Sequence, residues 1–188
     1  MLLASTSPRR RELLASLGVE FEVFSPPDRE LSEEGDHALG PEELAAHNVG
    51  TKTETAAEIY PEHAIIAADT IVILQGQAIG KPRDLNHAKQ TLHRLSGQTH
   101  TVLTALCLRK PKAAIKTELV RTQVTFLDLG QAQIEQYVQT VNVLDKAGAY
   151  GYQDHGDWVV KEVVGSESNV IGLPMETLSV WLKAEGYF

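Results

Sequence analysis

The chain has 188 residues, 43% of them hydrophobic and 22% charged, which predicts one ordinary globular domain spanning residues 1–188. Its net charge of −8 argues against a general nucleic-acid binder, because stable nucleic-acid binding needs a broad basic surface, but it permits a local cluster of cations. No apolar run can span a bilayer, no apolar signal core is present, and the one cysteine, Cys107, excludes an internal disulfide, so a cytoplasmic protein without a membrane partner is expected.

The first part of the chain alternates short strands with helices. In chain order, the predicted elements are a strand at 1–4, a helix from Ser7-Pro8 to before Gly18, a strand at 19–23, a loop at 25–40 and a helix from 41 to about 59. Ser is a favoured N-cap, Pro suits the first helical position, and Gly suits the residue after the end. The strand at 19–23 is predicted from alternating apolar and acidic residues.

The remainder contains longer strands. The predicted elements are a strand at 64–68 that ends at Asp69-Thr70, a hairpin at 71–79 around Gly76, a helix at 86–95, strands at 99–108 and 113–127, a helix at 131–139, a strand at 158–164 and a helix at 175–184. Long adjacent strands among helices predict an α/β fold with a mixed sheet.

Three arginines follow Ser5, Thr6, Ser7 and Pro8 in the first turn of the predicted helix. Free backbone N–H groups and the helix dipole favour an anion at this end, and guanidinium groups match phosphate oxygens. The dipole alone would disfavour cations here, so the arginines indicate a phosphate site. A solvated basic turn is the alternative.

Three further segments carry candidate residues. Asp69-Thr70, after a buried strand, could hold a divalent metal or activate water, or it could be a local turn. Lys81 lies in a Gly-Pro loop that could present it to a phosphate or be a plain surface turn, and the glycine spacing excludes a P-loop. The segment 145–153 mixes small and polar residues around a ligand or in a tight packed loop, and Gln153 could pair with a base edge.

Together these motifs resemble the Maf family. The matching segments, which follow the family's order over nearly the whole chain, are 4–10, 68–70, 80–84, 95–100, 145–151, Gln153 and 172–174. The resemblance implies an elongated α/β structure like the inosine triphosphate pyrophosphatases, with a mixed sheet and a cleft between two lobes. It also implies cleavage between the α and β phosphates of a nucleoside triphosphate, dependent on a divalent metal such as Mg or Mn.

The resemblance also implies roles for individual residues. Asp69 corresponds to the proton acceptor, and Glu30 with Asp69 to the metal ligands. The groups on the phosphate side correspond to Ser5, Arg10, Lys52, Lys81 and Lys146. Arg9, Thr70 and Gln153 match the branch that acts on dTTP and UTP, where the 7-methyl-GTP branch carries an aromatic residue, Gln and Glu.

Other functions remain open at this point. The chain could be a 7-methyl-GTP pyrophosphatase, or a non-catalytic nucleotide-binding regulator of cell division, although a pure sensor need not keep Asp69. An RNA-binding module is disfavoured because aromatic residues make up only 6% of the chain. A role in cleansing the nucleotide pool or arresting division is implied only by the resemblance, and a homodimer is left open.

Overall fold

The computed structural model describes residues 1–27, 31, 32 and 38–188. The strands are β1 (Leu2–Ala4), β2 (Glu22–Phe24), β3 (Ile65–Leu74), β4 (Gln77–Ile79), β5 (Thr99–Arg109), β6 (Lys116–Phe126) and β7 (Val160–Val164). The helices are α1 (Pro8–Ala15), α2 (Pro41–Ile59), α3 (Leu85–Leu95), α4 (Gln131–Thr140), α5 (Glu167–Ile171) and α6 (Met175–Ala184), with 3-10 turns η1 (Ala147–Ala149) and η2 (Gly156–Trp158).

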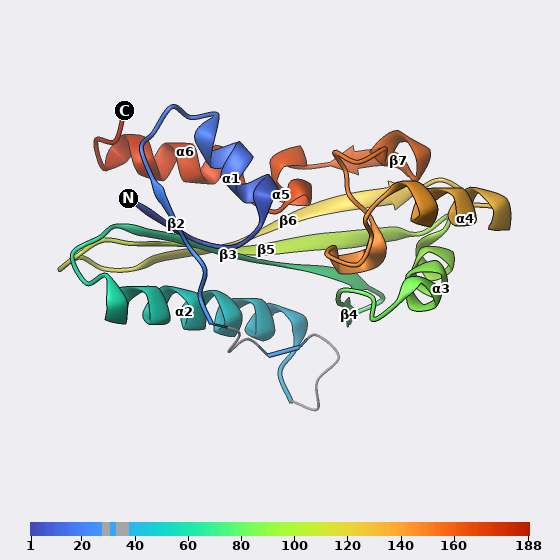
Figure 1. Cartoon of the computed structure of the whole chain (residues 1–188), viewed down its shortest axis with the longest axis horizontal. Coiled ribbons are helices and arrows are strands. Elements are labelled where there is room, and N and C mark those ends of the chain that lie inside the picture. Colours follow the sequence, from blue (N-terminus) through green and yellow to red (C-terminus); the bar gives the residue numbers. More distant parts are fainter. Residues whose placement is uncertain (28–30, 33–37) are drawn as a thin grey trace.

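The strands of the described residues form one mixed sheet in the order β2-β1-β3-β5-β6-β7, and β4 pairs with β3. β1 is parallel to β2 and β3, while the other pairs are antiparallel. Strands β3, β5 and β6 run along the length of the elongated molecule (Figure 1). The predicted α/β fold with an elongated mixed sheet is confirmed.

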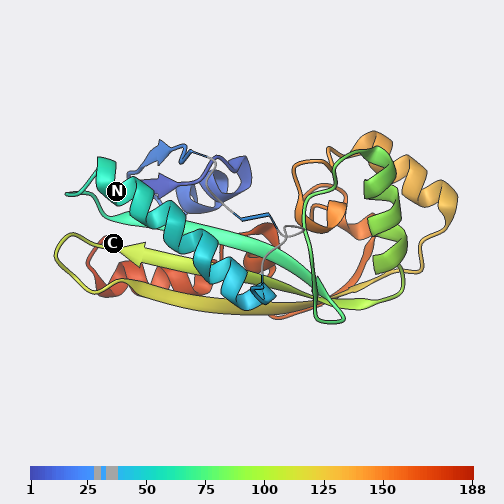
Figure 2. The same ribbon diagram turned by 90° about the horizontal axis from the view of Figure 1, so that it is seen from below.

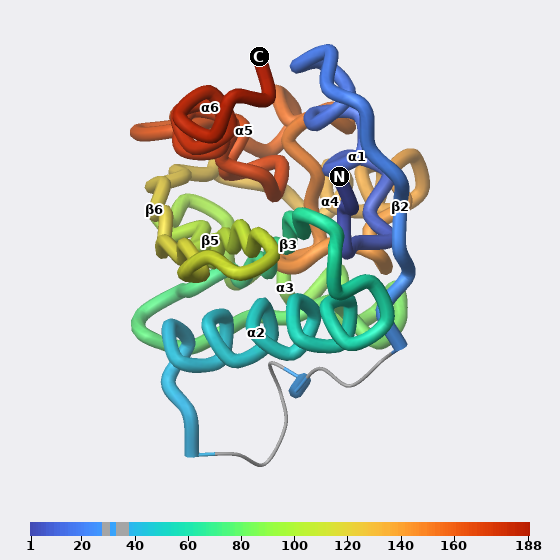
Figure 3. The backbone as a smooth tube through the Cα atoms, turned by 90° about the vertical axis from the view of Figure 1, so that its left-hand side faces the viewer, coloured from blue at the N-terminus to red at the C-terminus, as the bar shows by residue number. Residues whose placement is uncertain are grey.

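Two apolar cores lie on the two faces of one half of this sheet. α2 covers one face, and α1, α5 and α6 lie on the other (Figure 3). Residues along β3 alternate between the two cores: Ile65, Ala67 and Ile71 belong to the core beside α2, and Ile66 and Ala68 to the core that contains Leu178 and Leu182 of α6. By the same alternation, Asp69 faces α2 and Thr70 faces α1 and α5.

The other half of the molecule is built on the far ends of the long strands. α3, α4, β7 and the two 3-10 turns gather there around a third core, which includes Leu92, Phe126 and Tyr137 (Figure 2). No helix among the described residues is long and apolar enough to cross a bilayer.

One edge of β3 is open in its middle. β1 pairs with β3 at Leu2 and Leu3, and β4 pairs with it from Val72 onward. Between these pairings, residues 67–71 have no strand beside them on that edge among the described residues. The chain leaves the sheet after Ala4 and enters α1, so Asp69 and Thr70 belong to a rigid strand and still have open space at their edge.

The predicted end of a strand at Asp69-Thr70 is wrong. β3 continues through both residues to Leu74, and Ile71 and Val72 are buried and paired with Leu103 and Val102 of β5. Two polar residues interrupt the apolar run without ending the strand, because the open edge gives them space. The predicted hairpin around Gly76 is present, with β3 as its longer arm.

Smaller differences occur at weak sequence signals. The strand predicted at 19–23 is β2, which covers Glu22–Phe24. Val23, predicted to be on the apolar face, is exposed, and the next residue, Phe24, packs edge-on against Tyr60. The strands expected to begin at 113 and 158 begin at Lys116 and Val160. α5, with five residues, was not predicted because so short a helix carries little periodic signal.

A buried histidine in the third core makes stability depend on pH. His100 is hydrogen-bonded to the Tyr150 hydroxyl at 2.8 Å, and burial lowers the pKa of His100 from 6.5 to about 4. The unfolded chain therefore takes up a proton below pH 6.5, whereas the folded chain does so only near pH 4. The stabilisation is complete above pH 6.5 and is lost as the pH falls toward 4.

We expect the wild-type free energy of unfolding to fall by roughly 3 kcal/mol over this window because of His100. His100→Gln should remove that component of the pH dependence. Urea unfolding between pH 7 and pH 4 measures it, with the exposed His47→Gln as the control. Equal pH slopes for wild type and His100→Gln would contradict the assignment.

Candidate active site

A cavity of about 670 Å³ opens beside the free edge of β3. Its walls come from the turn between β1 and α1, the middle of β3, α5, and the segment 145–153 from the other half of the molecule. We call this cavity the cleft. Every predicted site residue that the structure describes lines it: Ser5, Arg9, Arg10, Lys52, Asp69, Thr70, Lys81, Lys146 and Gln153. Glu30 lies outside the described residues.

A buried ion pair lies at the base of the cleft. Lys52 Nζ of α2 is 2.7 Å from Asp69 Oδ1 and also donates to the carbonyl of Ala68 at 3.3 Å. Asn48 Nδ2 lies 3.5 Å from the other carboxylate oxygen, Asp69 Oδ2. α2 is continuous here, and the hydroxyls of Thr51 and Thr53 bond within the helix to the carbonyls of His47 and Val49, one turn earlier. Asp69 is thereby held in a fixed direction.

Arg10 joins the first turn of α1 to the sheet. Its Nε donates to the Gly172 carbonyl at 2.7 Å, and its Nη2 donates to Thr70 Oγ1 at 3.0 Å. Its Nη1 donates to Ser5 Oγ at 3.3 Å. The hydroxyl of Thr70 also bonds to Thr104 Oγ1 at 2.9 Å. The guanidinium group is therefore fixed over the open edge of β3, and Thr70 helps to hold it there.

The opposite wall presents Lys81 and Gln153. Both are exposed, and neither side chain has a hydrogen-bond partner in the part of the chain that the structure describes. The loop of Lys81 is fixed through its neighbour, because the Gly80 carbonyl accepts a bond from Gly148 N at 3.0 Å. Gly148 has φ +71°, and a Cβ there would lie 3.0 Å from Val72 Cγ2, so the close approach requires glycine.

The charge of the cleft suits an anion. Five cationic side chains line it, namely Arg9, Arg10, Lys52, Lys81 and Lys146, against two carboxylates, Asp69 and Asp145. The chain as a whole carries a charge of −8, so this cluster is a local positive site on an acidic protein. The first turn of α1, capped by Ser7 and begun by Pro8, adds its N-terminal dipole.

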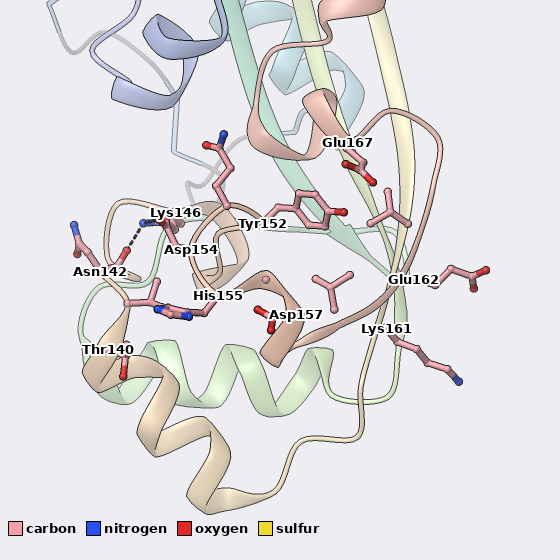
Figure 4. Close-up of a pocket in the computed structure, with 15 residues that line it drawn as sticks. Thr140, Asn142, Lys146, Tyr152, Asp154, His155, Asp157, Lys161, Glu162 and Glu167 are labelled. Atoms are coloured by element: carbon pink, nitrogen blue, oxygen red, sulfur yellow. Dashed lines mark hydrogen bonds and ion pairs between the residues drawn. The ribbon is translucent and has the colours of Figure 1, made fainter.

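A larger cavity of about 880 Å³ lies beyond Lys146 and Gln153. We call it the outer pocket (Figure 4). Its acidic lining consists of Asp154, Asp157, Glu162 and Glu167, against the two lysines Lys146 and Lys161. Because these carboxylates would repel phosphate groups, the smaller cleft is the better candidate for a nucleotide site despite the size of the outer pocket.

The cleft offers limited ligands for a divalent cation. The described residues contain no group of three His, Cys, Asp or Glu side chains that could hold a metal by themselves. Both oxygens of Asp145 are engaged, by Arg9 and by Lys146. Within the described part of the chain, Lys52 binds Asp69 through Oδ1 only, and Asp69 Oδ2 has just the 3.5 Å contact with Asn48, so Asp69 Oδ2 is the available carboxylate oxygen. Mg²⁺ commonly binds through one or two carboxylates together with substrate phosphates, so Asp69 fits such an ion when a triphosphate is bound.

Two residues of the site were missed from the sequence. Asn48 contacts Asp69 and also exchanges two hydrogen bonds with the backbone of Leu31. Its spacing of four residues from Lys52 places both on one face of a helix and could have indicated it. Thr104 bonds to Thr70 from the neighbouring strand β5, and only the pairing of β3 with β5 brings the two together.

Comparisons with known proteins agree with this fold. The sequence profile described as "Maf-like protein" matches residues 1–185. Proteins named dTTP/UTP pyrophosphatase are 41% identical in Akkermansia muciniphila, covering 100% of this chain and 97% of that protein, and 44% identical in Anaeromyxobacter dehalogenans, covering 100% and 94%. The solved structure of the Staphylococcus aureus Ham1 protein shares the fold, with TM-score 0.56, 16% identity and 98% of each chain covered.

Proposed function

Because this chain belongs to the Maf-like protein family, we propose that it hydrolyses dTTP and UTP to the nucleoside monophosphate and pyrophosphate. The observation that carries the proposal is the convergence of four further cationic side chains around the buried Lys52–Asp69 pair in one cleft. The names of the full-length relatives support the choice of substrates. The cytoplasm, where nucleoside triphosphates are used, is the compartment in which we expect the activity.

In the proposed reaction water attacks the α phosphorus in line with the leaving pyrophosphate, and different residues of the cleft have different roles. Asp69, held by Lys52 and Asn48, accepts a proton from the attacking water. Arg10 and Lys81, with the N-terminus of α1, neutralise the triphosphate and the leaving pyrophosphate. A divalent ion held by Asp69 and the phosphates would supply further neutralisation of charge at the phosphoryl oxygens.

The base of the substrate lies, in this proposal, toward Gln153. Its amide offers both a donor and an acceptor and can pair with the imide edge of thymine or uracil. Thr70 is small, and its hydroxyl is already bonded within the protein, so it contributes space rather than a contact with the base. Arg9, which bonds to Asp145, borders the same side.

The test is a screen of common nucleoside triphosphates and 7-methyl-GTP with magnesium or manganese in oxygen-18 water. We expect dTTP and UTP to have the highest kcat/KM, pyrophosphate to be released, and mass spectrometry to find the label in the monophosphate. A preference for 7-methyl-GTP would favour the other enzymatic branch. Binding without turnover would favour a nucleotide sensor, and label in orthophosphate would exclude attack at the α phosphorus.

A further inference from the structure

Gln153 stands on a tight turn that is fixed at both ends. Asp154 N donates to the Gly151 carbonyl at 3.2 Å, which closes the turn. The buried Tyr137 hydroxyl of α4 accepts from Gly151 N at 3.2 Å and donates to the Asp154 carbonyl at 3.1 Å. The backbone that carries Gln153 is therefore held while its side chain projects from an exposed position.

Lys146 holds the same turn from its other side. Its ammonium donates to the carbonyl of Asn142 at 2.5 Å and to Asp145 Oδ1 at 2.8 Å. It also forms an ion pair with Asp154 Oδ2 at 3.2 Å. Figure 4 shows Lys146 beside Asn142 and Asp154, with the bond to Asn142 drawn. Two of the three N–H donors of the ammonium therefore bond to protein oxygens, and the carboxylate of Asp154 lies within ion-pair distance of the same nitrogen.

Lys146 can pack against the turn only because residue 151 is a glycine and has no side chain. A Cβ at Gly151 would lie 2.6 Å from Lys146 Cε and 2.6 Å from Asp154 Oδ2. The stem of Lys146 thus packs directly against the backbone of the turn. Its side chain is only 6% exposed, and a buried charge of this kind requires the paired groups that it has here.

Lys146 also orients a contact across the mouth of the cleft. Asp145 binds Lys146 through one oxygen and Arg9 Nη1 of α1 through the other, at 3.1 Å. Partial burial raises the pKa of Asp145, but the hydrogen bonds from Lys146 and Arg9 outweigh that effect and lower the pKa overall. One ammonium therefore fixes both the turn of Gln153 and the partner of Arg9.

We propose that Lys146 is a positioning residue for the nucleoside side of the cleft, acting through Asp154 on the turn of Gln153 and through Asp145 on Arg9, rather than a ligand of the phosphates. The inference rests on the proposed function for the identity of the ligand. It also separates Lys146 from Lys81, whose ammonium has no partner among the described residues.

The test divides the substrate into its two halves. Inorganic tripolyphosphate probes the phosphate side by calorimetry, and thymidine probes the nucleoside side by NMR titration, so neither depends on turnover. The main variant is Lys146→Met with Asp154→Asn, which removes one charge of each sign and leaves the net charge unchanged. Lys81→Met and Gln153→Ala are the matched controls for the two halves.

We expect the double variant and Gln153→Ala each to weaken thymidine binding by roughly tenfold, which corresponds to the loss of about one matched hydrogen bond. Both should bind tripolyphosphate within about twofold of wild type, while Lys81→Met should lose roughly tenfold in tripolyphosphate binding. With dTTP, the double variant should show a larger change in KM than in kcat, because the residues that bind the triphosphate, Arg10 and Lys81, are unchanged.

Loss of tripolyphosphate binding in the double variant, with thymidine binding kept, would make Lys146 a phosphate ligand and overturn the proposal. If the double variant loses binding of both probes, or of neither, the proposal is overturned as well. Asp154→Asn alone, which keeps the lysine, should weaken thymidine binding in the same direction and serves if the double variant does not fold. A wild-type protein that binds both probes without hydrolysing dTTP would overturn the proposed function and leave the role of Lys146 decided by the binding data.

Discussion

Asp69→Asn is expected to lower turnover of dTTP by roughly 10²- to 10⁴-fold, the contribution typical of a positioned general base. Asparagine keeps the shape of the side chain but removes the charge that accepts a proton from water. Asp69 is 6% exposed and held by Lys52 at 2.7 Å. The other described carboxylate that lines the cleft, Asp145, is engaged by Arg9 and Lys146. The measurement is kcat for pyrophosphate release.

The matched control is Glu58→Gln, an exposed carboxamide replacement on the same helix as Lys52. It should leave turnover unchanged. Circular dichroism and thermal unfolding establish that Asp69→Asn is folded. A folded Asp69→Asn protein with wild-type turnover would show that the carboxylate has no part in the reaction.

Lys52→Met should have the second largest effect, on stability as well as on activity. It leaves the buried carboxylate of Asp69 without its 2.7 Å partner. Removing one member of a buried ion pair typically costs about 3–5 kcal/mol, and we expect about 3 kcal/mol because Asp69 also borders the cleft. Urea unfolding measures the change as a lower midpoint at constant m value.

The double variant Lys52→Met with Asp69→Asn separates the two effects. It removes both members of the Lys52–Asp69 ion pair, so most of the lost stability should return, while turnover stays as low as in Asp69→Asn. If the double variant is as unstable as Lys52→Met, the loss comes from packing of the lysine stem rather than from the unpaired carboxylate.

Elements with strong local signals were predicted correctly from the sequence. α2 and α6 occupy the predicted ranges: α2 begins at Pro41, and Leu178 and Leu182 of α6 repeat at helical spacing and are buried. β3 was cut short at Asp69 because the pattern of a single strand does not reveal where its neighbours stop. The missing strand between β1 and β4 is a property of the assembled sheet.

The residues of the site could be named from motifs, but their partners could not. The resemblance implied that Lys52 and Lys146 lie on the phosphate side and that Arg9 helps to select the base. It gave no indication that Lys52 binds Asp69 or that Lys146 is enclosed by its own loop. These pairings join residues that are up to 136 positions apart, as in Arg9 and Asp145. Lys52–Asp69 follows from the packing of α2 on β3, and Arg9–Asp145 from the packing of the two halves.

The open edge of β3 places stability and activity in opposition. A β1 strand longer by a few residues would extend its parallel ladder past Ala4, add hydrogen bonds and cover residues 67–71, all of which favour the folded state. The same extension would fill the cleft and bury Asp69 and Thr70 behind backbone. A longer β1 would therefore stabilise the sheet only by destroying the site. Thermostable relatives must gain their stability at other positions.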